Sequence, residues 1–286
     1  MNKRIALYVA VVSALFGMMG VAMFFARAAQ SQATLQPSSA QTTRAQSIPS
    51  TELRVYVLAR GGKFVGDDVG GALVTIRDAR TKEFLASGLS KGGSGVEDLM
   101  TIERARTNPL TIESAAYFST TLDLSEPRWL EFEAIGPPAA QGSENRVTTT
   151  EWVIPQAGTA NGNYVILELA GLNVDILEPP THFLPQHKPP LPMTLRANVT
   201  MMCGCPIAPT TAWKPDEIKV TMLVKRPDGK TDTVAFKFDE NAPYNAPSQF
   251  VAEYTATASG IYEAIVMAHQ QKFGNAGSDR ITFILP

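Results

Sequence analysis

Apolar and polar positions along the chain change pattern twice. Residues 5–25 form an apolar run without a charge. At about 1.5 Å rise per residue, a helix of this length spans roughly 30 Å, the thickness of a bilayer core. Residues 29–51 are rich in Gln, Ser, Thr, Ala and Pro and show no apolar period, which predicts a flexible tether. From residue 52 on, short runs of Val, Ile, Thr, Leu and aromatic residues alternate with Gly, Pro, Asn and Asp clusters, a pattern typical of antiparallel sandwiches or barrels.

The pattern predicts an all-β fold with two consecutive antiparallel β-sandwich domains after one N-terminal transmembrane helix and a flexible tether. We expect the membrane helix in 1–28, the linker in 29–51, the first sandwich in 52–177, a Pro-rich linker in 178–192 and an immunoglobulin-like sandwich in 193–286. The expected strands are 53–58, 72–76, 84–89, 117–122, 129–132, 147–154, 164–169, 193–202, 217–225, 231–238, 249–255, 261–268 and 279–285.

The N-terminal apolar run also predicts a location. It is longer than the apolar region of about 7–15 residues in a cleaved signal peptide, which favours an uncleaved signal anchor. Ala26-Arg27-Ala28 resembles a cleavage site, so cleavage stays open as the alternative. Lys3 and Arg4 precede the run, and the positive-inside rule keeps them in the cytoplasm. We therefore expect a single-pass protein of the cytoplasmic (inner) membrane, with its N-terminus inside and the bulk of the chain periplasmic or otherwise extracytoplasmic.

A small-residue pair lies within the expected membrane helix. Ser13 and Gly17 are four residues apart, a spacing that lets a second membrane helix approach closely. Small residues are also common in membrane helices that have no specific partner. The pair is thus a candidate for membrane-helix packing, with an unpartnered helix as the alternative.

Two segments resemble known β-sandwich families. Residues 70–78 (GGALVTIRD) and 81–88 (TKEFLASG) resemble the hairpin of transthyretin-like or carboxypeptidase-regulatory-like sandwiches, and this resemblance implies a non-catalytic scaffold. Residues 258–264 (ASGIYEA) resemble the corner before the sixth strand of an immunoglobulin-like or fibronectin-like sandwich, where a Tyr bonds back to the backbone. Ala264 stands where antibody domains carry a disulfide Cys, so the resemblance implies the fold without that bridge.

Charge limits the class of partner. The chain has 25 Lys and Arg against 27 Asp and Glu, a net charge of −2, whereas a protein that binds a phosphate backbone normally carries a basic surplus. We therefore expect no nucleic-acid partner. Residues 52–177 contain 11 basic and 17 acidic side chains, a surplus that anionic lipid headgroups repel and that favours a basic partner.

One cluster has the residue types for metal chemistry. Residues 201–206 (MMCGCP) include both cysteines of the chain. On an extended chain Met201, Cys203 and Cys205 point to one face, and soft thiolate and thioether ligands select Cu(I). In an immunoglobulin-like sandwich the loop near His269 lies at the same end, which makes His269 a candidate fourth ligand. We expect Trp213 to shield this site from water.

The same two cysteines allow other interpretations. Exported compartments favour disulfides, so Cys203 and Cys205 form a candidate short-loop bridge, structural or redox-regulated. In a third interpretation, the thiols are passive and the Met side chains only fill gaps in the core. All three stay open on the sequence alone.

Motifs of enzymes are missing from the chain. It has no Gly-x-Ser-x-Gly, His-Glu-x-x-His, phosphate loop, dinucleotide fingerprint or Cys-x-x-Cys-His, which argues against an enzyme. We expect a non-catalytic binding or accessory subunit of a membrane complex, anchored in the bilayer by residues 5–25. The alternative is a Cu(I)-binding metallochaperone or metal-site protein.

Overall fold

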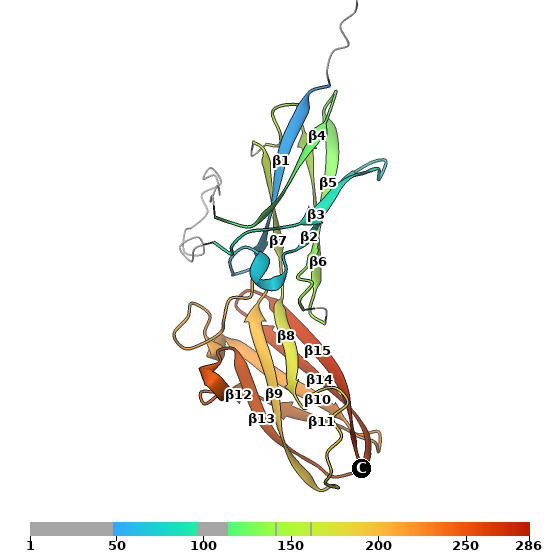
Figure 1. Ribbon diagram of the computed structural model, residues 1–286, viewed down its shortest axis with the longest axis vertical. Coiled ribbons are helices and arrows are strands. Elements are labelled where there is room, and N and C mark those ends of the chain that lie inside the picture. The colour runs from blue at the N-terminus through green and yellow to red at the C-terminus, as the bar shows by residue number, and fades with distance from the viewer. Residues whose placement is uncertain (1–47, 96–113, 141, 161) are drawn as a thin grey trace, which may run out of the picture. The chain divides into compact units, whose positions relative to one another are not determined.

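The computed structural model describes residues 48–95, 114–140, 142–160 and 162–286. The first seven strands are β1 (Ser50–Ala59), β2 (Leu73–Asp78), β3 (Phe84–Leu89), β4 (Tyr117–Asp123), β5 (Arg128–Gly136), β6 (Asn145–Val153) and β7 (Tyr164–Leu169). The next eight are β8 (Leu172–Glu178), β9 (Leu191–Met201), β10 (Ile218–Lys225), β11 (Thr231–Ala235), β12 (Lys237–Phe238), β13 (Gln249–Ala256), β14 (Gly260–Gln270) and β15 (Asn275–Leu285). Three single 3₁₀ turns complete the described elements, so the all-β prediction is confirmed (Figure 1).

The expected membrane helix, the Ser13 and Gly17 pair and the tether up to residue 47 lie outside the described residues. Within the described ranges no helix has the length and apolar character needed to cross a membrane. The anchor and the location that follows from it stay predictions.

Strands β1 to β7 build the first sandwich. One sheet has the order β4-β1-β7 and the other the order β3-β2-β5-β6. The expectation of purely antiparallel sheets is wrong at one pair, because β1 and β7 run parallel, with Val55 opposite Val165. A parallel pair needs a long crossover connection, and here the five intervening strands provide it.

Alternation along β5 shows why these residues form a sheet with one buried face. Leu130, Phe132 and Ala134 are buried in the core, whereas Glu131 and Glu133 point outward. Successive side chains of a strand point to opposite faces, so a period of two places every second residue in the sandwich interior. The same alternation places the side chain of Trp129 on the outer face, where it is 37% exposed.

Strands β8 to β15 build the second sandwich. Its sheets have the orders β12-β13-β9-β8 and β11-β10-β14-β15. This is the two-sheet order of the immunoglobulin architecture, with β11 at the additional position beside the third strand. The segment 231–238, expected as one strand, is two, because the chain changes sheets at Phe236: β11 pairs with β10 and β12 pairs with β13.

The corner before β14 matches the expectation for this architecture. The Tyr262 hydroxyl donates to the Ala258 carbonyl oxygen at 2.8 Å and lies 3.1 Å from the Ala258 backbone nitrogen. The Tyr262 ring is fully buried and stacks on Phe283 with 5.0 Å between ring centroids. Ala264 is fully buried two residues later. The predicted corner is therefore confirmed, with packing in place of a disulfide.

Strand β8 joins the two sandwiches. The sequence-based boundary placed residues 172–177 at the end of the first domain, but β8 pairs with β9 in the second sandwich, with Val174 opposite Val199. Only Ala170 and Gly171 separate β7 from β8. The described residues from 48 to 286 belong to one compact unit, and the division into two domains at 178–192 stays a prediction.

A turn after β1 makes hydrogen bonds to the second sandwich. We call residues 60–63 the junction turn. The Trp213 indole N–H donates to the Gly61 carbonyl oxygen at 2.8 Å, and the Asn275 amide donates to the Arg60 carbonyl oxygen at 2.9 Å. Gly61 has a φ of +64°, and a Cβ there would lie 2.7 Å from the Phe273 ring. The junction therefore needs a glycine at position 61, both for its backbone conformation and for the close ring contact.

Candidate functional site

The cysteine cluster begins where β9 ends. The Gly204 N–H donates to the Met201 carbonyl oxygen at 2.8 Å, and the Met201 N–H donates to the Cys205 carbonyl oxygen at 3.1 Å. Gly204 has a φ of +77°, a conformation that glycine adopts without a Cβ penalty. The expectation of an extended chain here is wrong, because residues 202–205 form a tight turn closed by these two bonds.

The turn brings the two cysteine side chains together. Both thiols are free and buried, and they hydrogen-bond to each other. Cys203 Sγ also accepts the backbone N–H of Lys63 in the junction turn at 3.4 Å. A Cβ on Gly62 would approach this sulfur to 3.2 Å. The Cys203 sulfur is thus packed against the backbone of the first sandwich.

The pKa values of the two thiols are shifted in opposite directions. The hydrogen bond to Cys203, and then burial, raise the pKa of the Cys205 thiol well above its usual range. Burial by itself raises the pKa of Cys203, but hydrogen bonds from Cys205 and the Lys63 backbone N–H together lower it below its usual value. Of the two thiols, Cys203 is therefore the one that ionises first, with Cys205 as its hydrogen-bond donor.

The other predicted ligands do not all share this environment. Met201 is fully buried beside the turn. Met202, which is not among the predicted ligands, points away from the turn, since its terminal methyl occupies the space that a Cβ on Gly171 would need. His269 is exposed on β14, between Lys219 and Ala276 in the sheet register. In the part of the chain that the structure describes, no group of three His, Cys, Asp or Glu side chains can hold a metal ion.

Trp213 lies where shielding was expected and makes one further contact. Its side chain is buried, and its indole N–H holds the Gly61 carbonyl of the junction turn. The next residue, Gly62, packs on Cys203 Sγ. Trp213 therefore fixes the turn that covers the cysteines, in addition to filling space. A copper ion at Met201, Cys203, Cys205 and His269 stays a prediction.

A second feature was not predicted from the sequence. The outer face of the sheet β3-β2-β5-β6 exposes large apolar side chains, which we call the aromatic face: Leu73, Phe84, Leu89, Trp129, Trp152 and Ile154. Trp129 and Trp152 are directly opposite on β5 and β6, and Leu73 is opposite Leu89 on β2 and β3. The sequence carries one sign of this face, because both tryptophans occupy outward positions of strands in which polar and apolar residues alternate. That the two tryptophans lie opposite each other could not be predicted, because it depends on the register between the strands.

Beside this tryptophan pair the surface forms a hollow of about 450 Å³, which we call the tryptophan groove. Asp78, Arg80, Glu83, Arg128, Trp129, Trp152 and residues 123–127 line it. Asp78 Oδ1 accepts the backbone N–H groups of Arg80 and Thr81 at 2.9 and 2.8 Å, which shapes the turn between β2 and β3. Such turns formed by an aspartate side chain are common in hairpin loops.

An ion-pair network lines the groove. Arg128 contacts the Asp78 carboxylate at 2.8 Å and the Glu83 carboxylate at 2.6 Å. The Thr81 backbone N–H and then the Arg128 guanidinium hold the pKa of Asp78 well below its usual range. Arg80 lies differently, with its guanidinium carbon 5.5 Å from the Trp152 ring centroid and 6.0 Å from that of Trp129.

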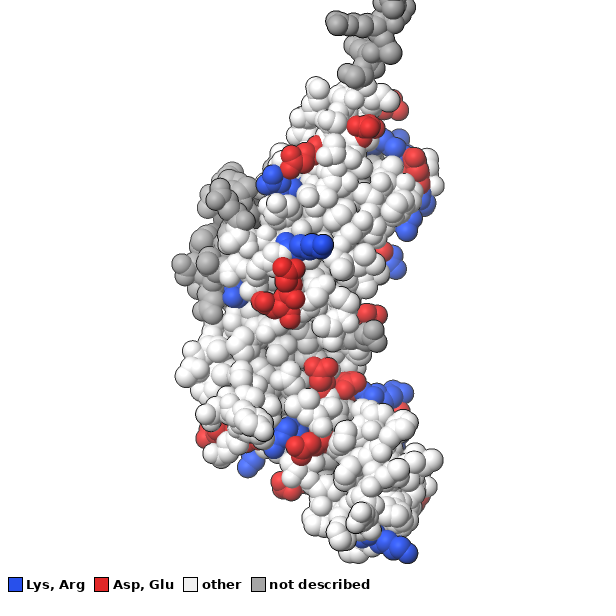
Figure 2. Space-filling view, viewed as in Figure 1, with Lys and Arg blue, Asp and Glu red and all other residues white. Residues whose placement is uncertain are grey.

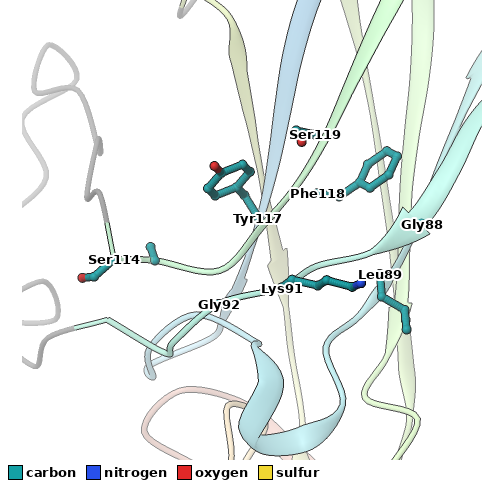
Figure 3. Close-up of a pocket in the computed structure, with 9 residues that line it drawn as sticks. Gly88, Leu89, Lys91, Gly92, Ser114, Tyr117, Phe118 and Ser119 are labelled. Carbon is teal, nitrogen blue, oxygen red and sulfur yellow. The ribbon is translucent and has the colours of Figure 1, made fainter.

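A larger hollow lies between the edges of β3 and β4, with a volume of about 680 Å³. Figure 3 shows Lys91, Tyr117 and Phe118 around it. A Cβ on Gly88 would lie 2.4 Å from the Phe118 ring, so this ring crosses the gap between the two sheets at that glycine. The hollow thus marks where the two sheets of the first sandwich meet through side chains.

Charged groups elsewhere form no continuous basic surface on the face seen in Figure 2, where small acidic and basic groups are separated by uncharged surface. This distribution agrees with the near balance of Lys and Arg against Asp and Glu. Phosphate-backbone binding needs a basic patch or stripe. The surface in that view offers none.

Comparisons with known proteins do not assign this chain to a protein family. No protein-family model matches the chain, and no curated protein matches it. Among solved structures, the fibronectin(III)-like modules of Clostridium thermocellum CbhA are similar at a TM-score of 0.27 and 11% identity, covering 82% of this chain and 93% of that one.

Two further solved structures are similar over 82% of this chain. A tetra-tandem repeat from the extending region of a large adhesion protein has a TM-score of 0.26 and 13% identity, with 50% of that chain covered. A complex of ICOS with ICOS-L and an anti ICOS-L VNAR domain has a TM-score of 0.21 and 11% identity, with 94% of the matched chain covered. The assignment of an all-β protein with an immunoglobulin-like second sandwich therefore rests on its own strand order and tyrosine corner.

Proposed function

We propose that this chain is a non-catalytic accessory protein that binds partner subunits of a membrane complex. In this proposal residues 5–25 anchor it in the inner membrane, and its sandwiches lie on the extracytoplasmic side. The first sandwich acts as a scaffold of the transthyretin-like or carboxypeptidase-regulatory-like kind. The aromatic face is the observation that carries the proposal.

The composition of the aromatic face supports protein binding. Exposed apolar residues scattered singly are ordinary, whereas adjacent ones that form a patch mark an interaction site. Trp129 and Trp152 are adjacent in this way across β5 and β6. Interfaces are enriched in aromatic residues, and tryptophan is frequent among the residues that contribute most to binding. Trp152 is 50% exposed and Phe84 57% exposed, so both have apolar surface to bury against a partner.

The test uses the full-length chain, extracted from membranes in a mild detergent and captured under native conditions. We expect a complex larger than the single chain, with a partner at fixed stoichiometry. Replacing both tryptophans (Trp129→Ala with Trp152→Ala) should lower partner recovery at least about tenfold, the effect of truncating residues central to an interface. Ile261→Ala is the matched control, because Ile261 is 64% exposed on the second sandwich. A solubilised chain without any bound subunit would contradict the proposal.

A second function, Cu(I) binding, is favoured by the contact between the Cys203 and Cys205 thiols within one turn. Two adjacent thiolates are soft ligands that suit Cu(I). Binding must displace the proton that Cys205 holds, so affinity should rise with pH.

The measurement is copper content and free-thiol count on one anaerobic, reduced sample of the full chain. We expect about one Cu(I) per chain, lost when both cysteines are replaced (Cys203→Ser with Cys205→Ser). His269→Ala tests the predicted fourth ligand, and unchanged copper content in that variant would remove His269 from the site. Absence of copper together with absence of free thiols would instead support a Cys203–Cys205 disulfide.

A further inference from the structure

Arg80 is placed unusually for an exposed arginine. It lies in the turn between β2 and β3, and its guanidinium is within about 6 Å of both indole rings of the tryptophan groove, the distance at which a cation and a ring face attract. Among the described residues no carboxylate is close enough to form an ion pair with it. Its contacts are therefore to the two indoles rather than to an anion.

The groove around Arg80 has a surplus of negative charge. Four carboxylates line it, from Asp78, Glu83, Asp123 and Glu126, against the two guanidinium groups of Arg80 and Arg128. Arg128 is paired with Asp78 and Glu83. Asp123 and Glu126 are exposed and have no ion pair among the residues that the structure describes. Two acidic groups and two ring faces thus remain to favour a cation.

The Arg80 side chain can leave without disturbing the fold. The turn is held by the backbone N–H groups of Arg80 and Thr81, which donate to Asp78 Oδ1. The exposed Arg80 guanidinium makes no hydrogen bond or ion pair to the described residues. Its removal therefore opens the ring faces while the turn and the Arg128 network stay in place.

We propose that the tryptophan groove binds an arginine or lysine side chain from a basic segment of a partner protein, and that Arg80 occupies this position in the free chain. The proposal rests on the partner-binding function proposed above and names the chemistry of the partner. The groove volume of about 450 Å³ is within the range of pockets that enclose small ligands. Because Arg80 competes for the same ring faces, the free chain binds more weakly than an open groove does.

The sign of the Arg80 effect separates this proposal from others. An anionic ligand would use Arg80 as its partner, so Arg80→Ala would weaken binding. A neutral ligand stacked on the indoles also gains when Arg80→Ala opens the ring faces, so it is recognised by equal binding of the arginine and citrulline peptides. A cationic ligand gains from the open ring faces and from the loss of a like charge, so it binds more tightly than its neutral counterpart.

The experiment titrates the full chain, in a neutral detergent, with a short Gly- and Ser-spaced peptide that carries two arginines and has blocked ends. Intrinsic fluorescence reports on the groove, because the chain has three tryptophans and the third, Trp213, is buried. The matched control peptide carries citrulline, which keeps the shape of arginine without its charge.

We expect the arginine peptide to bind Arg80→Ala about two- to fivefold more tightly than the unmodified chain. Arg80→Lys should restore the weaker affinity, and Trp152→Ala should abolish the fluorescence change in either background. Equal affinity for the citrulline peptide, weaker binding by Arg80→Ala, binding of a neutral oligosaccharide at the same rings, or absence of peptide binding by every variant would each overturn the inference.

The two proposals fail separately. Loss of partner recovery in the double tryptophan variant, combined with no effect of the arginine peptide, would sustain the accessory function and overturn the cationic groove. Peptide binding to Arg80→Ala without any captured subunit would do the reverse.

Discussion

Replacing Trp213 by alanine is expected to lower the free energy of unfolding by about 3–5 kcal/mol, the usual cost of truncating a buried tryptophan. Trp213 is 2% exposed and among the largest buried side chains. Its loss leaves a cavity and removes the donor to the Gly61 carbonyl oxygen, an acceptor in a poorly hydrated region. The measurement is a urea titration of the full chain in mild detergent, followed by circular dichroism.

Two comparisons separate packing from hydrogen bonding at Trp213. Trp213→Phe keeps a large ring but not the N–H donor, so its cost should be about 1–3 kcal/mol. Trp152→Ala is the control, because this half-exposed side chain should change stability by less than about 1 kcal/mol. In Trp213→Ala the junction turn loses its anchor, so Cys203 should also react faster with a thiol reagent. An unchanged urea midpoint for Trp213→Ala would show that the junction adds nothing to stability.

Placing a single methyl group at Gly277 is expected to destabilise the second sandwich nearly as strongly. Gly277 lies on β15 opposite Ala268. A Cβ at this position would lie 2.1 Å from the Leu172 carbonyl oxygen and 2.9 Å from Val174 Cγ2. Leu172 and Val174 belong to β8 in the other sheet, so the two sheets must move apart to make room for the added methyl group. Gly277→Ala should cost about 3 kcal/mol, the upper end of overpacking effects, measured by the same urea titration.

Gly93→Ala is the matched control for Gly277→Ala. A Cβ on Gly93 would lie 3.4 Å from the Ser114 carbonyl oxygen, an ordinary contact distance. Its effect should stay within about 1 kcal/mol. Equal urea midpoints for the two variants would mean that β8 and β15 are not in close backbone contact.

Local patterns located most strands because burial alternates along many of them, as in β5, β9 and β14. The segments 84–89 and 164–169 were predicted with the bounds observed for β3 and β7. Alternation and turn residues are properties of a few consecutive positions, so they can be recognised without a partner strand. The tyrosine corner at Tyr262 was predictable for the same reason, since the hydroxyl bonds only four residues back.

Strand β8 was not predicted, and the expected domain bounds placed residues 172–177 at the end of the first sandwich. Only two residues separate it from β7, so no turn cluster marks the boundary. What places it in the second sandwich is its pairing with β9. Pairing partners are chosen by packing across the whole sandwich, not by the local sequence.

The candidate sites were also predictable only in part. Proximity of Cys203 and Cys205 followed from their spacing, although a turn rather than an extended chain achieves it. The hydrogen bond from Lys63 to Cys203 joins residues 140 positions apart, and the tryptophan groove needs the register of β5 on β6. Neither contact has a local signature.

The sequence by itself determined the all-β class, the positions of most strands and the residues able to bind a soft metal. Only the tertiary structure decided which strands share a sheet, which groups surround the thiols and that Trp129 and Trp152 meet beneath Arg80. The physical reason is that strand formation depends on neighbouring residues, whereas the environment of a site depends on close packing between distant ones.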